Sequence, residues 1–127
     1  MSGLPMGIVY ANVKVVSPDQ TREVELRLIV DTGSVLTWVP GRLLQELGIA
    51  STRTRTFRSI ERETPPRRVG EALIRCQGLE GTVPVVFADE TDASVLGVTA
   101  LEILGLTVDP NTGRLEREDI SLALVGG

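Results

Sequence analysis

One acidic side chain stands where an apolar segment ends and a turn begins. The apolar residues 28–30 are followed by Asp31, Thr32, Gly33 and Ser34. A carboxylate beside a buried strand loses part of its hydration, so its charged form needs hydrogen-bond donors or a shared proton. Glycine lets the chain turn sharply and bring backbone N–H groups close to the carboxylate, and the two hydroxyls can donate further bonds. Asp31 is therefore the first candidate for acid–base chemistry.

The same four residues also suit an ordinary turn, because aspartate caps its own backbone and glycine accepts a positive φ. Two further stretches favour an active site. Residues 35–40 continue the loop as Val-Leu-Thr-Trp-Val-Pro, and residues 94–97 read Ser-Val-Leu-Gly. In this order, the stretches resemble the active-site loop of aspartic peptidases and the hydrophobic-hydrophobic-glycine element that crosses beneath it.

The length of the chain indicates which branch of the family it resembles. With 127 residues, the chain suits a single domain over 1–127, and it holds one Asp-Thr-Gly. Pepsin-type members carry two such loops in one long chain, so the similarity is to the single-lobe, retropepsin-like branch, in which two identical chains each supply one aspartate. The resemblance implies a mainly β fold: a closed single-lobe β-barrel with one short C-terminal helix and a flap hairpin.

The resemblance also implies a mechanism. Asp31 from each of two chains would meet at the dimer axis and share a proton, as in aspartic proteases generally. One carboxylate would activate a water that attacks the peptide carbonyl, while the protonated one donates to the carbonyl oxygen. By the same resemblance, Thr32 braces the two loops, Gly33 lines the substrate path and Ser34 orients the carboxylate. The substrate is an extended peptide, and neither a metal nor an organic cofactor is required.

Composition excludes several other chemistries. The chain has no histidine and a single cysteine, Cys76, which excludes Ser-His-Asp, Cys-His and histidine-ligated zinc sites within one chain. We expect Cys76 to be a small buried side chain. The net charge of −4 argues against nonspecific binding to nucleic acid. No long apolar run and no basic leader followed by an apolar segment occur, so we expect a cytoplasmic protein without a membrane span.

Alternation and turn residues predict the elements that position Asp31. Helical turns are expected over 40–47 and 99–105, each closed by a glycine, and Trp38 is expected to anchor the strand before the first of them. A tight turn is expected at 78–81. The predicted strands are 8–16, 23–30, 36–39, 52–60, 69–77, 82–88, 106–108, 114–116 and 120–125.

The long hairpin over 52–77 corresponds to the flap that covers the peptide in this family. Its tip has no glycine between 61 and 68, whereas the family usually has a glycine-rich tip. Seven arginines lie between 53 and 75, and we expect them to favour peptides with acidic residues. The candidate substrate-binding residues are Ile60, Glu61, Arg62, Glu63, Thr64, Pro65 and Pro66.

Three alternatives remain open at this stage. A peptidase-like dimer that binds peptides or proteins but cleaves weakly or not at all would suit the unusual hairpin. The arginines at 53–68 could bind nucleic acid, although Phe57 is the one aromatic residue among them. In a monomeric hydrolase, Asp89 or Asp92 could pair with Asp31, but a solvated loop is the simpler interpretation of these two acids. The terminal strand, 122–125, has no evident partner within the chain, and we expect it in the dimer interface.

Overall fold

The computed structural model describes residues 7–58 and 63–118 of the chain and is mainly β. No helix in these two ranges is long and apolar enough to cross a membrane. The expected terminal strand at 120–125 lies outside the described residues. The elements are β1 (Tyr10–Val16), β2 (Glu23–Val30), β3 (Thr37–Pro40), α1 (Gly41–Glu46), β4 (Ser51–Arg55), β5 (Arg67–Cys76), β6 (Leu79–Ala88), β7 (Val95–Leu96), α2 (Val98–Leu104), β8 (Leu106–Val108) and β9 (Leu115–Arg117).

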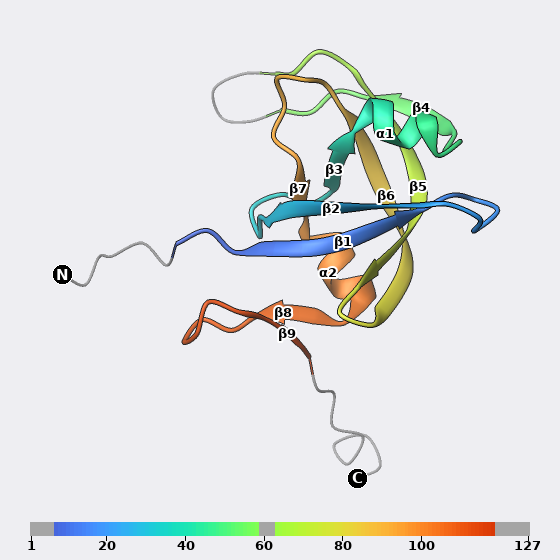
Figure 1. Cartoon of the computed structure of the whole chain (residues 1–127). Coiled ribbons are helices and arrows are strands. Elements are labelled where there is room, and N and C mark those ends of the chain that lie inside the picture. The colour runs from blue at the N-terminus through green and yellow to red at the C-terminus, as the bar shows by residue number, and fades with distance from the viewer. Residues whose placement is uncertain (1–6, 59–62, 119–127) are drawn as a thin grey trace, which may run out of the picture.

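Seven strands form one sheet that closes into a ring (Figure 1). The strand order is β1, β2, β7, β3, β6, β5 and β4, and β1 also pairs with β5, which brings the two sides of the sheet together. The short strands β8 and β9 pair separately after α2. This arrangement confirms the expected mainly β, single-lobe fold with a short helix, α2, near its C-terminal end. It also confirms the helical turns expected at 40–47, which form α1.

Aliphatic side chains fill the interior of the ring because each strand alternates between its two faces. In β1, the side chains of Ala11, Val13 and Val15 are buried, whereas the residues between them are exposed. Leu28 and Ile74 are also fully enclosed. Cys76 belongs to the same core, as the sequence predicts, and burial raises the pKa of its thiol.

The turn between β5 and β6 falls earlier than the sequence predicts. Cys76 pairs with Leu79, so the connection consists of Gln77 and Gly78, both with positive φ (52° and 78°). Two-residue hairpin loops favour such conformations because they match the twist of the strands. Gln77 is a non-glycine residue in this position, and its side-chain amide donates to the Leu115 carbonyl at 3.0 Å. The prediction of a turn at 78–81 is therefore wrong by one to three residues.

A network of hydroxyl and amide donors orders the turn between β1 and β2. Asp19 Oδ1 accepts bonds from the Thr21 N–H (3.0 Å), the Thr21 hydroxyl (2.8 Å) and the Ser17 hydroxyl (2.7 Å). The Thr21 N–H, followed by the two hydroxyls, lowers the pKa of Asp19 from 3.8 to about 2. The ionised carboxylate therefore stabilises this turn.

Replacing Asp19 with Asn should flatten the acid side of the stability profile. A carboxylate whose pKa is lower in the folded chain stabilises the fold above its unfolded pKa, and the stabilisation is lost as the pH falls from about 4 toward 2. Urea unfolding midpoints, measured from neutral pH down to about pH 3, should fall more steeply for the wild type than for Asp19→Asn. Parallel profiles would contradict this role for the turn.

Candidate active site

Asp31 lies in a tight loop, residues 31–34, that connects β2 to β3. The Ser34 N–H donates to the Asp31 carbonyl at 3.1 Å and closes the turn, and the Gly33 N–H donates to Asp31 Oδ1 at 2.9 Å. The backbone N–H of Asp31 itself donates to the Leu96 carbonyl at 3.0 Å. The expected approach of a backbone donor to the carboxylate is thus present, and the Asp31 side chain is exposed at the surface.

The strand β7 passes between the two strands that carry this loop. Its Val95 and Leu96 pair in parallel with Ile29 and Val30 of β2, and Val95 also pairs with Trp38 of β3. β7 therefore holds the strands on both sides of the Asp31 loop, although it lies far from them in the sequence. The structure confirms the prediction that the Val-Leu-Gly stretch crosses beneath the loop.

The start of α2 continues the support of the loop. The Val98 N–H donates to the Ser34 carbonyl at 2.8 Å, and the Thr99 N–H donates to the Val35 carbonyl at 3.0 Å. The first N–H groups of a helix have no acceptor within the helix. In α2, two loop carbonyls accept the bonds from two of these N–H groups. The loop is therefore held by β7 and by the first turn of α2 together.

Gly97 connects β7 to α2 where no side chain fits. A Cβ at this position would lie 2.3 Å from the Leu36 carbonyl oxygen and 2.7 Å from the Ser34 carbonyl oxygen. These are backbone atoms, which cannot move aside as a flexible side chain can. The Gly97 N–H donates to the buried Thr37 hydroxyl at 3.0 Å. Close approach of two chain segments, rather than an unusual φ, requires glycine here.

The hydroxyls of the loop have different surroundings. The Ser34 hydroxyl donates to the Leu36 carbonyl at 2.7 Å, so within this chain it stabilises the backbone of the loop. Orientation of the carboxylate comes instead from the Gly33 N–H. Thr32 is exposed beside Asp31.

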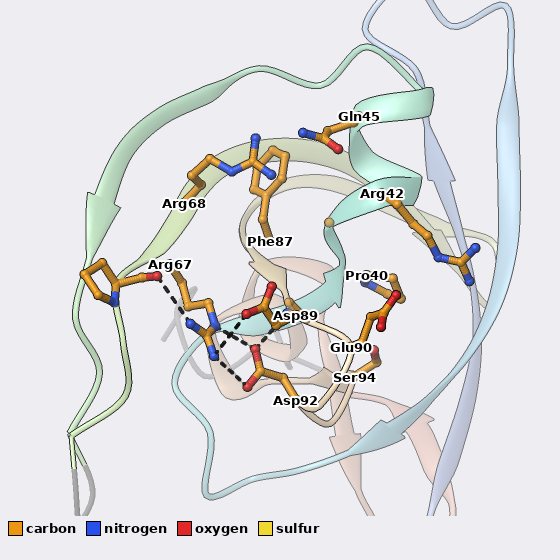
Figure 2. A pocket seen from close by; sticks show the side chains of 13 residues that line it. Pro40, Arg42, Gln45, Arg67, Arg68, Phe87, Asp89, Glu90, Asp92 and Ser94 are labelled. Atoms are coloured by element: carbon orange, nitrogen blue, oxygen red, sulfur yellow. Dashed lines mark hydrogen bonds and ion pairs between the residues drawn. The ribbon is translucent and has the colours of Figure 1, made fainter.

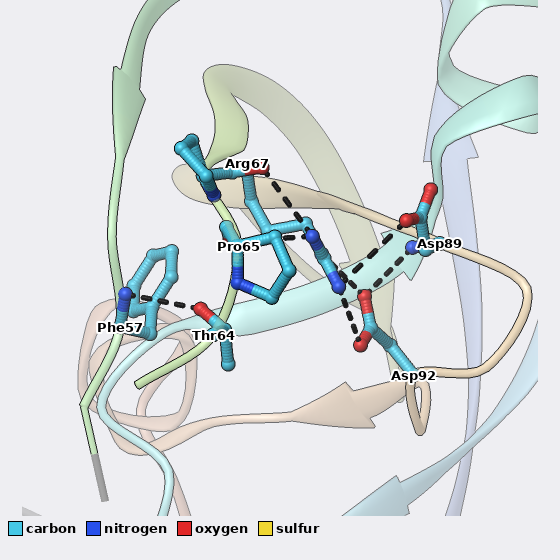
Figure 3. Close-up of polar contacts among 7 residues, drawn as sticks. Phe57, Thr64, Pro65, Arg67, Asp89 and Asp92 are labelled. Atoms are coloured by element: carbon cyan, nitrogen blue, oxygen red, sulfur yellow. Dashed lines mark hydrogen bonds and ion pairs between the residues drawn. The ribbon is translucent and has the colours of Figure 1, made fainter. Parts of the chain in front are cut away.

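The structure describes residues on both arms of the hairpin that the sequence predicts as the flap (Figure 3). The Thr64 N–H donates to the Phe57 carbonyl at 2.7 Å, and the Phe57 N–H donates to the Thr64 hydroxyl at 3.1 Å. Arg58 and Glu63 form the next pair outward. Three candidate residues of this hairpin, Ile60, Glu61 and Arg62, lie outside the described residues.

A small second core joins this hairpin to the Asp31 loop. Leu36, Val69 and Val86 are buried together, and Trp38 and Phe57 pack against them. The two aromatic rings lie 4.9 Å apart between centroids and are tilted by 58°, an arrangement that aromatic pairs favour. Trp38 is half-buried and is the anchor that the sequence predicts.

Three of the six described arginines between 53 and 75 pair with carboxylates, and two more lie over aromatic rings, which leave their charge in place. Arg62 lies outside the described residues. The ion pairs compensate part of the positive charge that binding to nucleic acid would require. The contacts are Arg58 with Glu63, Arg67 with Asp89 and Asp92, Arg75 with Glu23 and Glu80, Arg55 with the Phe57 ring and Arg68 with the Phe87 ring.

A pocket of about 620 Å³ opens between α1, the start of β5 and the loop after β6 (Figure 2). Asp89 and Asp92 line it and face Arg67, whereas no residue of the Asp31 loop does. The structure therefore gives no support to a monomeric pair of Asp31 with either acid. No cluster of three or more His, Cys, Asp or Glu side chains that could hold a metal occurs in ranges 7–58 and 63–118.

Comparison with protein-family models matches residues 12–100 to the aspartyl protease family, which is retropepsin-like. The chain belongs to this family. The matched range contains the Asp31 loop, the hairpin and β7, so the family assignment covers all three parts of the candidate site. No curated protein sequence matches this aspartyl protease domain in a direct search.

One ion pair of this domain does not follow from local sequence patterns. The sequence places Arg67 among the arginines of the hairpin and predicts a solvated loop around Asp92, yet the two side chains form a bidentate pair in the structure. The two residues are 25 positions apart, and no local pattern links them. The Asp92 hydrogen bonds raise the pKa of Arg67 above its ordinary value.

Replacement of Gly97 by Ala should unfold or severely destabilise the domain. Because the new Cβ would overlap two backbone carbonyls, the free energy of unfolding should fall by about 3 kcal/mol or more. Chemical denaturation measures this change. Gly105→Ala at the other end of α2 is the matched control: nothing lies near its Cβ, and its positive φ alone should cost about 1–2 kcal/mol. Equal losses for the two variants would contradict the steric explanation.

Proposed function

We propose that this domain is an aspartic endopeptidase that acts as a homodimer, with one Asp31 from each chain. The observation that carries the proposal is a rigidly supported Asp31 whose carboxylate is nevertheless exposed. A catalytic group must be fixed in position and also accessible to substrate and to its partner. An aspartate that only forms a turn would not need support from β7 and from the first turn of α2.

The surface around the loop supports association of two chains. Thr32 and Gly33 are exposed, and Val35 is 68% exposed although the buried residues Leu36 and Thr37 follow it directly. In a two-fold dimer, a residue near the axis lies opposite its own copy. Two Asp31 loops joined in this way would bring two carboxylates together and cover the apolar Val35 side chains.

The chemistry follows from the pair of carboxylates. Two acids in close contact cannot both be ionised without strong repulsion, so they hold one proton between them. The ionised member takes a proton from a water molecule, which attacks the peptide carbonyl, and the protonated member donates to the carbonyl oxygen. The tetrahedral intermediate then breaks its C–N bond as the amine leaves with a proton. Gly33 fixes the carboxylate through its N–H and leaves the face above it open for substrate.

The substrate class is an extended peptide that lies between the Asp31 loop and the hairpin of β4 and β5. Peptides bound as an added strand gain affinity from main-chain hydrogen bonds and specificity from alternate side chains. The second core places Trp38 and Phe57 between these two elements and holds them at a fixed separation. Among the described arginines of the hairpin, Arg53 has no partner and is available for acidic side chains of a peptide.

The alternative function is a dimer that binds peptides without cleaving them. The glycine-free segment 61–68 favours it, because a stiffer hairpin opens less readily over a substrate. Both functions need the dimer and the groove, and only the peptidase needs the Asp31 proton. A single substitution therefore separates them.

Substitution of Asp31 by Asn should abolish cleavage and leave the dimer folded. Asn keeps the shape of the side chain but cannot cycle a proton, and in a symmetric dimer one change removes both carboxylates. Hydrolysis of casein, followed at acidic and neutral pH, should fall by at least roughly 10³-fold. Asp109→Asn, in the turn between β8 and β9, is the matched control and should retain activity. Full activity in Asp31→Asn would place the chemistry elsewhere.

Sedimentation of the purified chain should give a dimer at micromolar concentration. Removal of residues 121–127, which include the terminal apolar segment, should weaken association, because that segment is expected in the interface. The truncated chain should sediment as a monomer and lose casein cleavage together with the dimer. A monomeric wild type that cleaves casein, or a truncated chain that remains dimeric, would contradict this assembly.

A further inference from the structure

Arg67 is a buried arginine at the first position of β5, where the hairpin returns to the sheet. Only 8% of its surface is exposed, which is unusual for a side chain that carries a permanent charge. Its guanidinium forms a bidentate pair with Asp92: Nε donates to Oδ2 at 2.7 Å and Nη2 donates to Oδ1 at 3.1 Å. Such a buried charge is tolerated because two of its nitrogens donate to a carboxylate that is itself mostly buried, with 16% of its side chain exposed.

The remaining nitrogen of Arg67 binds the hairpin itself. Nη1 donates to the Pro65 carbonyl at 3.2 Å and to the Pro66 carbonyl at 3.3 Å. Proline has no N–H, so this part of the chain cannot donate to a neighbouring strand and is held through its carbonyls. Figure 3 shows the guanidinium between Pro65 and the two acids of the loop after β6.

The loop that receives Arg67 is itself closed by Asp92. Asp92 Oδ2 accepts a bond from the Asp89 N–H at 2.8 Å, and the Asp89 carboxylate lies 3.7 Å from Arg67 Nη2. This loop, residues 89–94, leads directly into β7, whose Leu96 carbonyl accepts the N–H of Asp31. Arg67 therefore lies between the hairpin and the segment that supports the Asp31 loop.

We propose that Arg67 is a positioning residue that fixes the returning arm of the hairpin, residues 63–66, against the 89–94 loop and so sets the wall of the peptide groove. This inference rests on the proposed function. Lysine could not replace arginine here, because one ammonium cannot bind a carboxylate with two parallel bonds and reach two carbonyls on the opposite side. The outer pair of Arg58 and Glu63 is a poor substitute, since Arg58 is 78% exposed and screened by water.

The test compares two variants of β5 in the full chain. Arg67→Lys keeps the charge and removes the fork, whereas Arg75→Met removes a partly exposed arginine that pairs with Glu23 and Glu80 farther along the same strand. Amide hydrogen exchange, measured by NMR, should become roughly tenfold faster or more at Thr64 and Asp89 in Arg67→Lys. The buried Val85 amide should not change, and Arg75→Met should leave Thr64 and Asp89 as in the wild type.

Kinetics supply the second readout. In Arg67→Lys, KM for casein should rise by roughly 10- to 100-fold while kcat changes less, because the groove is misplaced and the Asp31 pair is intact. Unchanged exchange at Thr64, or faster exchange with an unchanged KM, would overturn the positioning role. If the lysine variant does not fold, Asp92→Asn takes its place, since it keeps the shape of the acceptor.

The two proposals fail separately in this experiment. A wild type that cleaves no casein would contradict the peptidase, while the exchange comparison would still decide whether Arg67 holds the arm of the hairpin. Normal cleavage by the wild type, with no effect of Arg67→Lys on amide exchange, would support the peptidase function and contradict the positioning role of Arg67.

Discussion

The candidate site depends on the close passage of the segment 95–99 beneath the Asp31 loop. Five backbone hydrogen bonds or pairings from this segment fix the loop: the bond from the Asp31 N–H to the Leu96 carbonyl, the pairings of β7 with β2 and with β3, and the bonds from two N–H groups at the start of α2. Such an approach is possible because Gly97 has no side chain. The position of the Asp31 carboxylate thus depends on Gly97, which lies 66 positions later in the sequence.

The hairpin is supported in a different way, by side chains. On its inner side, Phe57 packs on Trp38 over the small second core, and at its base Arg67 binds the carbonyls of both prolines and the Asp92 carboxylate. Backbone ladders hold strands that pair along their length, but an arm that contains two prolines lacks those donors. A buried arginine with five N–H donors replaces the missing ladder.

Local patterns predicted most of the fold, because alternation and turn residues act over a few positions. These patterns predict the long strands of the ring, both helices and the crossing of residues 95–97, with most ends within one to three residues. The strand predicted at 52–60 is the exception, because β4 already ends at Arg55. The turn at Gln77 and Gly78 was missed because glutamine is an unusual residue at positive φ, and its stabilising bond to Leu115 joins elements 38 residues apart. Arg67 and Asp92 are also far apart in the sequence, so local patterns do not predict their ion pair. The motif predicts Asp31, Thr32, Gly33 and Ser34 as site residues, whereas the direction of the Ser34 hydroxyl depends on the folded backbone around Leu36.

The strand β4 stands at the end of the sheet order, on an edge that the closure of β1 on β5 does not cover. All five of its residues, Ser-Thr-Arg-Thr-Arg, are exposed. An uncovered edge of apolar residues would recruit other strands and lead to fibrous aggregates, whereas charged edge residues repel them. The two arginines of β4 therefore favour solubility at high concentration, independently of any contact with substrate.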